Sequence, residues 1–276
     1  MILTQQSNDR VTLMANFKHS VLIIDDDLLN ITALTYLLSD EFNVFTERSS
    51  RNSIDVAKEV KPDIILLDVV MPDMNGFEVI TALKKDEVTK DIPVIFVTGL
   101  NNTRDEEQGL TLGAVDYVTK PYSSYIIKLR IKNQLQIFNQ KHVIHELSNG
   151  TGLEVKKESI LIIDDDKLNI IALTRILGAD YQVYFEGNGE GGIKAAKTFK
   201  PDLILLDVLM PEITGFEVIK TLKADEETKG IPVIFLTGRR DVQDEEAGFV
   251  LGAIDYITKP FSASVVKLRV GNQLKI

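Results

Sequence analysis

Acidic side chains, a threonine and a lysine occur in the same order twice along this chain. The first set is Asp25, Asp26, Asp27, Asp68, Thr98 and Lys120, and the second is Asp164, Asp165, Asp166, Asp207, Thr237 and Lys259. Carboxylates brought together without a cation repel one another, and a hard divalent ion such as Mg²⁺ removes that conflict. A lysine ammonium and a threonine hydroxyl can then bind an anionic group, and an aspartate beside a metal can attack phosphorus. The pattern indicates metal-assisted phosphoryl transfer to an aspartate.

The two sets belong to a duplicated segment. Residues 20–137 align without a gap to residues 159–276 at a constant offset of 139, and over half of the paired positions are identical. This period is far longer than the roughly 20–50 residues of solenoid repeats, so each copy should be a complete domain with its own core. We predict an N-terminal tail at 1–18, a first domain at 19–140, a linker at 141–158 and a second domain at 159–276.

Composition narrows the functional class. The net charge of −10 over 276 residues argues against broad contact with a phosphate backbone, so nucleic acid is not an expected partner. The chain has no cysteine, which favours a reducing compartment, and we expect the cytoplasm. The polar opening segment, residues 1–18, predicts neither a signal peptide nor a membrane span.

Alternating strands and helices are expected in each copy. The predicted strands of the first copy are Val21–Ile24, Asn43–Thr46, Ile64–Leu67, Val94–Val97 and Val115–Val118. Three of these runs are continuously apolar, which is typical of parallel strands buried on both faces, and stretches with helical periodicity separate them. The fold class is therefore α/β, with two doubly wound five-stranded parallel sheets of the flavodoxin type, strand order 2-1-3-4-5, one per domain.

Such sheets bind ligands beyond the carboxyl ends of their strands. In the first copy, Asp25 and Asp26 end the first strand, Asp68 the third and Thr98 the fourth, while Lys120 follows the fifth. The same edge of the second copy should carry Asp164, Asp165, Asp207, Thr237 and Lys259. The third aspartate of each triplet, Asp27 or Asp166, is expected to cap the first helix instead.

Over nearly all of its length, each copy resembles the receiver domains of bacterial two-component response regulators. The resemblance implies phosphorylation of Asp68 and Asp207, with Thr98, Thr237, Lys120 and Lys259 contacting the phosphoryl group. It implies Mg²⁺ held by Asp25, Asp26, Asp68 and the main-chain carbonyl of Val70, and equivalently by Asp164, Asp165, Asp207 and the carbonyl of Leu209. Tyr117 and Tyr256 match the aromatic switch residue, although an aromatic side chain there could simply pack, and each Lys-Pro bond is expected to be cis.

Two competing interpretations are weaker. Residues 187–192 fit the dinucleotide-binding pattern G-x-G-x-x-G, but the equivalent segment of the first copy, residues 48–53, contains no glycine. Phosphatases that use an aspartate nucleophile resemble D-x-D, whereas the position two residues after each acceptor is Val70 or Leu209. Neither nucleotide binding nor phosphatase activity is expected.

The predicted function is two-component signal transduction by a chain that is not itself an enzyme apart from catalysing its own phosphoryl uptake. A histidine kinase or phosphotransfer protein is the expected donor. The face formed by the fourth helix, fifth strand and fifth helix should change on phosphorylation, and it is a candidate surface for a homodimer.

The expected output lies outside this chain. The fifth helix of the first copy should overrun its domain as far as Ser148, and the second copy stops at Ile276 inside the equivalent helix. We therefore expect a longer protein whose output domain is a cyclic-dinucleotide synthase or a histidine kinase, as the resemblance implies. A stand-alone dimerising adaptor, or a phosphorelay intermediate without catalytic output, is the alternative.

Overall fold

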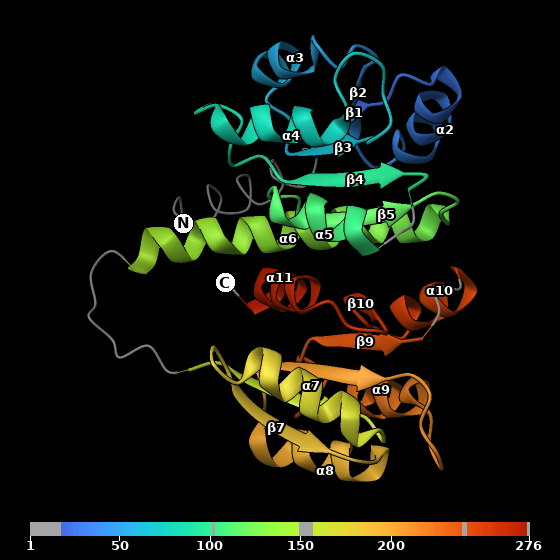
Figure 1. Ribbon diagram of the computed structural model, residues 1–276, viewed down its shortest axis with the longest axis vertical. Coiled ribbons are helices and arrows are strands. Elements are labelled where there is room, and N and C mark those ends of the chain that lie inside the picture. Colours follow the sequence, from blue (N-terminus) through green and yellow to red (C-terminus); the bar gives the residue numbers. More distant parts are fainter. Residues whose placement is uncertain (1–17, 101–102, 149–156, 239–241, 275–276) are drawn as a thin grey trace, which may run out of the picture. The chain divides into compact units, whose positions relative to one another are not determined.

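The computed structural model describes residues 18–100, 103–148, 157–238 and 242–274 (Figure 1). These residues form two compact units, one ending at Thr98 and the other beginning at Gly99. The division falls between the fourth strand of the first copy and the helix that follows it.

Strands and helices alternate through the first copy as the sequence predicts. Its elements are β1 (Ser20–Ile24), α2 (Leu28–Leu38), β2 (Asn43–Glu47), α3 (Ser53–Val60), β3 (Ile64–Leu67), α4 (Gly76–Lys85), β4 (Val94–Thr98), α5 (Thr103–Thr111), β5 (Asp116–Thr119) and α6 (Ser124–Ser148). Strand β5 begins one residue later than predicted, and the carbonyl oxygen of Val115, just before it, accepts a hydrogen bond from the Asn272 side chain at 3.1 Å.

The second copy repeats this order. Its elements are β6 (Ser159–Ile163), α7 (Lys167–Leu177), β7 (Gln182–Glu186), α8 (Gly189–Phe199), β8 (Leu203–Asp207), α9 (Gly215–Ala224), β9 (Val233–Thr237), α10 (Val242–Val250), β10 (Asp255–Thr258) and α11 (Ala263–Leu274). Helix α6 has 25 residues and α11 has 12, so the predicted overrun of the fifth helix of the first copy is confirmed. The expectation about Ile276 lies outside the described residues.

Each copy contributes one five-stranded sheet. The strand orders are β2-β1-β3-β4-β5 and β10-β9-β8-β6-β7, which confirm the predicted order 2-1-3-4-5 in both copies. The pairing is parallel and its register is the same in the two sheets: Val21 lies opposite Ile64, and Ile160 lies opposite Leu203. The two copies are therefore equivalent at the level of individual strand positions.

Strand side chains in the second copy alternate between two cores, as the period of a strand requires. Ile160 and Ile162 of β6 pack with residues of α7 and α11. Leu161 and Ile163 pack on the other side, with residues of α8 and α9. Since all four side chains are fully or almost fully buried, the sheet is covered on both faces, and only the ends of its strands remain for chemistry.

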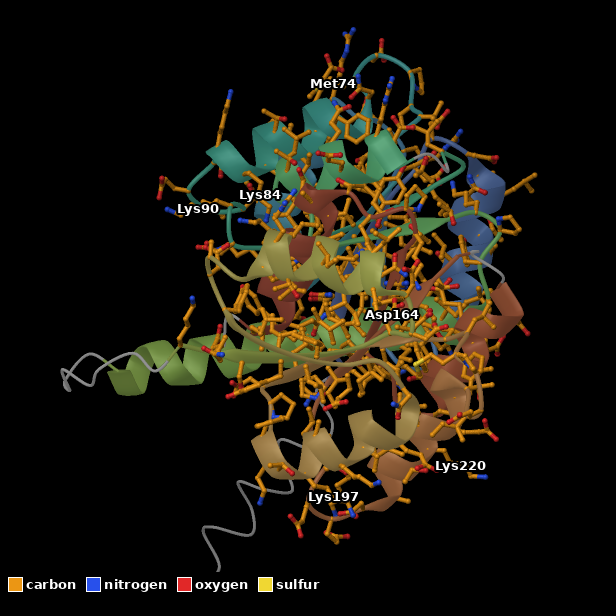
Figure 2. All side chains as sticks on the ribbon, turned by 60° about the horizontal axis from the view of Figure 1, so that its bottom comes forward. Met74, Lys84, Lys90, Asp164, Lys197 and Lys220 are labelled. Atoms are coloured by element: carbon orange, nitrogen blue, oxygen red, sulfur yellow. The ribbon has the colours of Figure 1, made fainter. Side chains whose placement is uncertain are left out.

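A half-buried lysine joins the end of the third helix of each copy to the loop before the next strand. Lys84, labelled in Figure 2, donates hydrogen bonds to the carbonyl oxygens of Lys90 (2.9 Å) and Ile92 (2.8 Å). Lys223 makes the equivalent bonds, and burial lowers the pKa of both ammonium groups. Each lysine therefore stabilises a loop by hydrogen bonds: Lys84 the loop between α4 and β4, and Lys223 the loop between α9 and β9.

The glycine-rich segment of the second copy begins a helix. The Asn188 side chain accepts a hydrogen bond from the backbone N–H of Gly191 at 2.8 Å and so caps α8. A Cβ atom at Gly189 would lie 2.6 Å from Ile213 and Val218, and one at Gly192 would lie 2.5 Å from Ile163. These two glycines therefore allow α8 to pack closely on its neighbours, which accounts for the motif without a nucleotide.

Within the part of the chain that the structure describes, no helix combines the length and the apolar character needed to cross a bilayer.

The two-sided burial of the sheet gives a stability prediction. Replacing Ile162 by Ala removes a side chain that is fully buried, and we expect the free energy of unfolding to fall by about 2–5 kcal/mol. The matched control is Ile171→Ala at a position that is 58% exposed, where we expect a change below about 1 kcal/mol. Urea denaturation followed by circular dichroism measures both; equal losses would contradict the burial described here.

Candidate functional site

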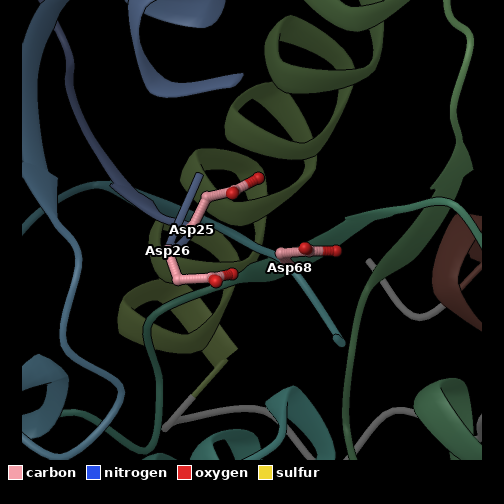
Figure 3. A group of neighbouring side chains, drawn as sticks. All are labelled: Asp25, Asp26 and Asp68. Atoms are coloured by element: carbon pink, nitrogen blue, oxygen red, sulfur yellow. The ribbon is translucent and has the colours of Figure 1, made fainter. Parts of the chain in front are cut away.

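Three carboxylates of the first copy meet at the carboxyl edge of its sheet. Asp25 and Asp26 follow β1, and Asp68 follows β3. One oxygen atom from each lies within 4.8 Å of the others, and Figure 3 shows the three side chains as neighbours. Asp25 and Asp68 are buried, while Asp26 is partly exposed. Parallel strand ends thus bring together acidic groups that lie more than 40 residues apart in sequence.

Local hydrogen bonds orient the first aspartate. Asp25 Oδ1 accepts from the backbone N–H of Asp27 at 2.9 Å and from the Asn30 side chain at 3.2 Å. In the second copy Asp164 is held in the same way, by the N–H of Asp166 and the side chain of Asn169. The asparagine was not identified in the sequence, although its retention in both copies was an available signal.

The third aspartate of each triplet faces the helix and not the carboxylate cluster. Asp27 Oδ1 accepts from Leu29 N at 2.8 Å, and Asp166 Oδ1 accepts from Leu168 N at 2.8 Å. Both residues are the N-caps of their helices, α2 and α7. The predicted capping role of the third aspartate in each triplet is confirmed.

A lysine joins the cluster of the second copy. Lys259 Nζ lies 2.9 Å from Asp164 Oδ2 and 2.9 Å from Asp207 Oδ1. Asp164, Asp165 and Asp207 again offer oxygen atoms within 4.8 Å of one another. Asp164, labelled in Figure 2, is fully buried and Asp165 is exposed, so the cluster has one open side.

Burial and charge have opposite effects at this cluster. Burial raises the pKa of Asp207, and repulsion from Asp164 adds to that rise, while the hydrogen bond and charge of Lys259 oppose it. Burial alone would lower the pKa of Lys259, but its bonds to Asp164 and Asp207 outweigh burial and the pKa is raised. The lysine therefore stays charged, and the Asp207 carboxylate holds a proton more readily than an exposed aspartate.

The remaining predicted residues lie on the expected elements. Thr98 ends β4 and is fully buried, and Thr237 ends β9. Lys120 follows β5, in the compact unit that begins at Gly99, and both Lys-Pro bonds are cis. Val70 and Leu209, two residues after Asp68 and Asp207, are 60% and 75% exposed.

The two tyrosines point inward. Tyr117 and Tyr256 are buried, and their hydroxyl groups donate to the carbonyl oxygens of Leu100 (3.3 Å) and Glu245 (3.0 Å) respectively. Each tyrosine is therefore bonded to the segment that follows the fourth strand of its copy.

The clusters suit a hard divalent cation. Magnesium prefers a few carboxylates together with water and phosphate oxygens, and three closely spaced carboxylates with an open side provide that donor set. An ion there would also relieve the repulsion that contributes to the raised pKa of Asp207. The residues present therefore fit Mg²⁺ in both copies.

A glycine lies against the main chain of Asp68 in the first copy and of Asp207 in the second. A Cβ atom at Gly76 would lie 2.2 Å from the backbone oxygen of Asp68, and one at Gly215 would lie 2.2 Å from that of Asp207. The first residue of α4 or α9 thus touches the main chain of this aspartate. Its N–H also donates to the carbonyl of the residue after the aspartate, Val69 or Val208, at 2.9 Å in both copies.

The sequence profile of the response regulator receiver domain matches residues 21–132 and 160–270. Because these matches cover most of the chain, this chain belongs to the response regulator receiver family, with two receiver domains in tandem.

Individual relatives agree with the family assignment. The chain is 28% identical over 270 residues to response regulator PleD of Caulobacter vibrioides, an alignment that covers 92% of this chain and 59% of PleD. It is 37% identical over 140 residues to a probable cyclic di-GMP phosphodiesterase of Vibrio cholerae, covering 51% of this chain and 32% of that protein. The chain therefore spans less than two thirds of the length of either relative.

Among solved structures, chemotaxis response regulator CheY4 of Vibrio cholerae is similar. The match has a TM-score of 0.42 and 26% identity, and it covers 43% of this chain and all of CheY4.

The close approach at Gly215 gives a testable prediction. In Gly215→Ala the new methyl group collides with the main chain of Asp207, so we expect Mg²⁺ affinity of the second copy to fall by about ten-fold or more. The matched control is Gly230→Ala, where no atom lies within 4 Å of the added carbon and affinity should be unchanged. Calorimetric titration of chains that also carry Asp25→Asn and Asp68→Asn isolates this site; equal affinities in the two glycine variants would contradict the geometry.

The raised pKa of Asp207 predicts a pH dependence. Metal binding needs the ionised carboxylate, so protons compete with Mg²⁺ as the pH falls. Since the pKa lies above the ordinary 3.8, affinity in the same Asp25→Asn, Asp68→Asn background should be full at neutral pH and lost through a midpoint above 3.8. Titration calorimetry at a series of pH values measures that midpoint. Undiminished affinity down to pH 3.8 would show that the carboxyl group is not shifted in this direction.

Proposed function

We propose that this chain is a two-site phosphorylation switch in which Asp68 and Asp207 accept phosphoryl groups. The observation that carries the proposal is the arrangement in the second copy, where Lys259 lies 2.9 Å from both Asp164 and Asp207 at an open acidic cluster. The equivalent carboxylates of the first copy are grouped within the same distance. Membership in the receiver family supports this use of the site.

The chemistry follows from the residues at the strand ends. The ionised Asp207 carboxylate attacks the phosphorus of a phosphohistidine or a small acyl phosphate in line. A new P–O bond forms as the P–N bond, or the P–O bond of the acyl phosphate, breaks, and the imidazole or carboxylate leaves. When bound, Mg²⁺ supplies charge that offsets the negative oxygens of the transferring group.

The remaining residues bind and sense the group. Lys259 exchanges a carboxylate partner for a phosphoryl oxygen, and the Thr237 hydroxyl donates to another; Lys120 and Thr98 have these roles in the first copy. Mg²⁺ would be held by the carboxylates of each cluster, and the main-chain carbonyls of Val70 and Leu209 would each supply a further oxygen ligand. The tyrosines, Tyr117 and Tyr256, respond as switch residues, which their hydroxyl bonds to neighbouring main chain support.

The domain boundaries proposed from the sequence accompany this function. Receiver domains at 19–140 and 159–276, with a tail at 1–18 and a linker at 141–158, agree with family matches at 21–132 and 160–270. We infer a cytoplasmic chain that takes phosphate from a histidine kinase or phosphotransfer protein. Any enzymatic output lies in further sequence, an inference that the partial coverage of both relatives supports.

Loss of the acceptor carboxylates tests the proposal. With acetyl phosphate and Mg²⁺, we expect intact-mass spectrometry to find up to two phosphoryl groups on the wild-type chain. Asp68→Asn and Asp207→Asn should each leave one site, and the double variant none, because an amide is not a nucleophile for phosphorus. The matched control is Asp166→Asn, which keeps a helix cap and should keep both sites. Phosphate uptake by the double variant would refute the proposal.

A further inference from the structure

Six charged side chains form a buried cluster within the compact unit that begins at Gly99. The paired-charge cluster consists of Glu106, Asp116 and Arg130 from the first copy and Glu245, Asp255 and Arg269 from the second. Five of these side chains are at most 6% exposed, and Glu245 is 19% exposed. None of them belongs to the metal clusters described above.

Each arginine binds its own copy and the other one. Arg130 Nη1 lies 2.6 Å from Asp116 and 3.1 Å from Asp255, and its Nη2 binds Glu245. Arg269 Nη1 lies 2.7 Å from Asp255 and 3.1 Å from Asp116, and its Nη2 lies 2.6 Å from Glu106. Because the repeat offset of 139 relates each residue to its counterpart, the pairing is reciprocal, as in a twofold dimer.

Neutral and apolar contacts repeat the same reciprocity. The Asn133 side chain donates to the carbonyl oxygen of Ile254 at 3.4 Å, and its counterpart Asn272 donates to that of Val115 at 3.1 Å. Ile126 of α6 joins the hydrophobic core of the second copy. The contact therefore has an apolar component beside its charges, as specific interfaces do.

Buried charges make this contact selective. Removing a guanidinium or a carboxylate from water is costly, and the cost is offset only when every charge has well-placed partners. Four carboxylates face two guanidinium groups here, and burial together with repulsion from Asp116 raises the pKa of Asp255. Neither half of the cluster satisfies its charges alone, so each copy needs a surface that carries the complementary half.

The cluster is joined to the candidate phosphorylation site of the second copy by β10. Asp255 of the cluster begins this strand, and Lys259 of the site directly follows it. Tyr256, between them, donates its hydroxyl to the Glu245 carbonyl, while the Glu245 side chain binds Arg130 of the first copy.

Ring packing adds a second connection. The Phe249 ring lies edge-on to Tyr256 at 5.1 Å, and the guanidinium carbon of Arg130 lies over Phe249, also at 5.1 Å. A Cβ atom at Gly248 would lie 1.8 Å from the Tyr256 hydroxyl, so this glycine makes room for the buried tyrosine. A residue of the first copy thus rests on the aromatic group that holds the switch tyrosine.

We propose that the first copy, through the paired-charge cluster, is the partner that reads the state of the site at Asp207. This inference rests on the proposed function, because it names the partner of the same switch. The two copies are covalently joined, which gives the intramolecular partner an effective concentration of the order of millimolar. The face predicted as a homodimer surface is therefore used within one chain.

Spin labels test the pairing in the full chain. The chain has no cysteine, so Thr111→Cys and Val250→Cys place labels only at these two exposed positions at the ends of α5 and α10. Electron–electron resonance should give one narrow distance distribution for the parent chain. Arg130→Glu should reduce that population by about ten-fold or more, and adding Glu245→Arg should restore it by re-forming a pair across the copies.

Two controls keep this test decisive. Lys132→Glu reverses a charge at an exposed position of the same helix and should leave the distribution unchanged. Dilution with unlabelled chain should have no effect. A signal that disappears on dilution would show that the paired-charge cluster forms between two chains. A distance distribution unaltered by Arg130→Glu would show that the cluster does not hold the copies together. Either result overturns the proposal.

Beryllium fluoride with Mg²⁺ tests the coupling. The Asn133→Ala variant removes one hydrogen bond between the copies, so that paired and unpaired chains should both be visible. In this background, an anionic group on Asp207 gives Lys259 a new partner and fixes the end of β10. We expect the ratio of paired to unpaired chains to rise about five-fold or more, and to stay constant in Asp207→Asn. Fluorine NMR reports binding separately: bound fluoride with an unchanged or lower ratio overturns this inference alone, whereas no bound fluoride overturns the proposed function.

Discussion

Repulsion between carboxylates held within 4.8 Å of one another is the interaction on which the rest of each copy depends. Carboxylates so close are stable only when hydrogen bonds and cations offset their charge. The protein provides part of this from its own chain, through the asparagine and backbone N–H groups on Asp164 and the ammonium group of Lys259. The open side of the same cluster leaves room for a divalent cation to share these carboxylates.

The sheet supplies the rigidity that this proximity requires. Asp164 and Asp207 follow or end neighbouring parallel strands, so their main-chain positions are set by ladder hydrogen bonds and by cores on both faces. Gly215 adds a limit from the opposite side, because the start of α9 lies against the backbone of Asp207. Asp207 therefore has little freedom to move, and a change in charge is more readily relieved by movement of side chains and loops around it.

Strand β10 connects two charge centres of different character. One end leads to Lys259, which is partly exposed and can exchange partners, and the other carries Asp255, which is buried among fixed partners. The exchangeable centre suits chemistry, and the fixed centre suits recognition, because buried ion pairs tolerate few alternative surfaces. Tyr256 lies between the two and is bonded to the main chain of a residue in the fixed centre.

Local sequence patterns were enough to predict the strands, their order and the acidic edge of each sheet. Continuous apolar runs predicted the parallel strands, and the residue after each run predicted the acidic edge, since parallel strands must end on one side. The cap at Asp166 and the strand order were also readable, because they depend on neighbouring residues and on the rules of chain crossover.

Tertiary structure alone decided which polar groups meet across long stretches of chain. Neither the close approach of Gly215 to the acceptor's backbone nor the pairing of Arg130 with Asp255 has a periodic or local signature. Retention of these residues in both copies marked them as constrained without naming their partners. Charged residues are ordinarily solvated, and only the packing of one copy's helix and strand against the other's shows that these are buried and paired.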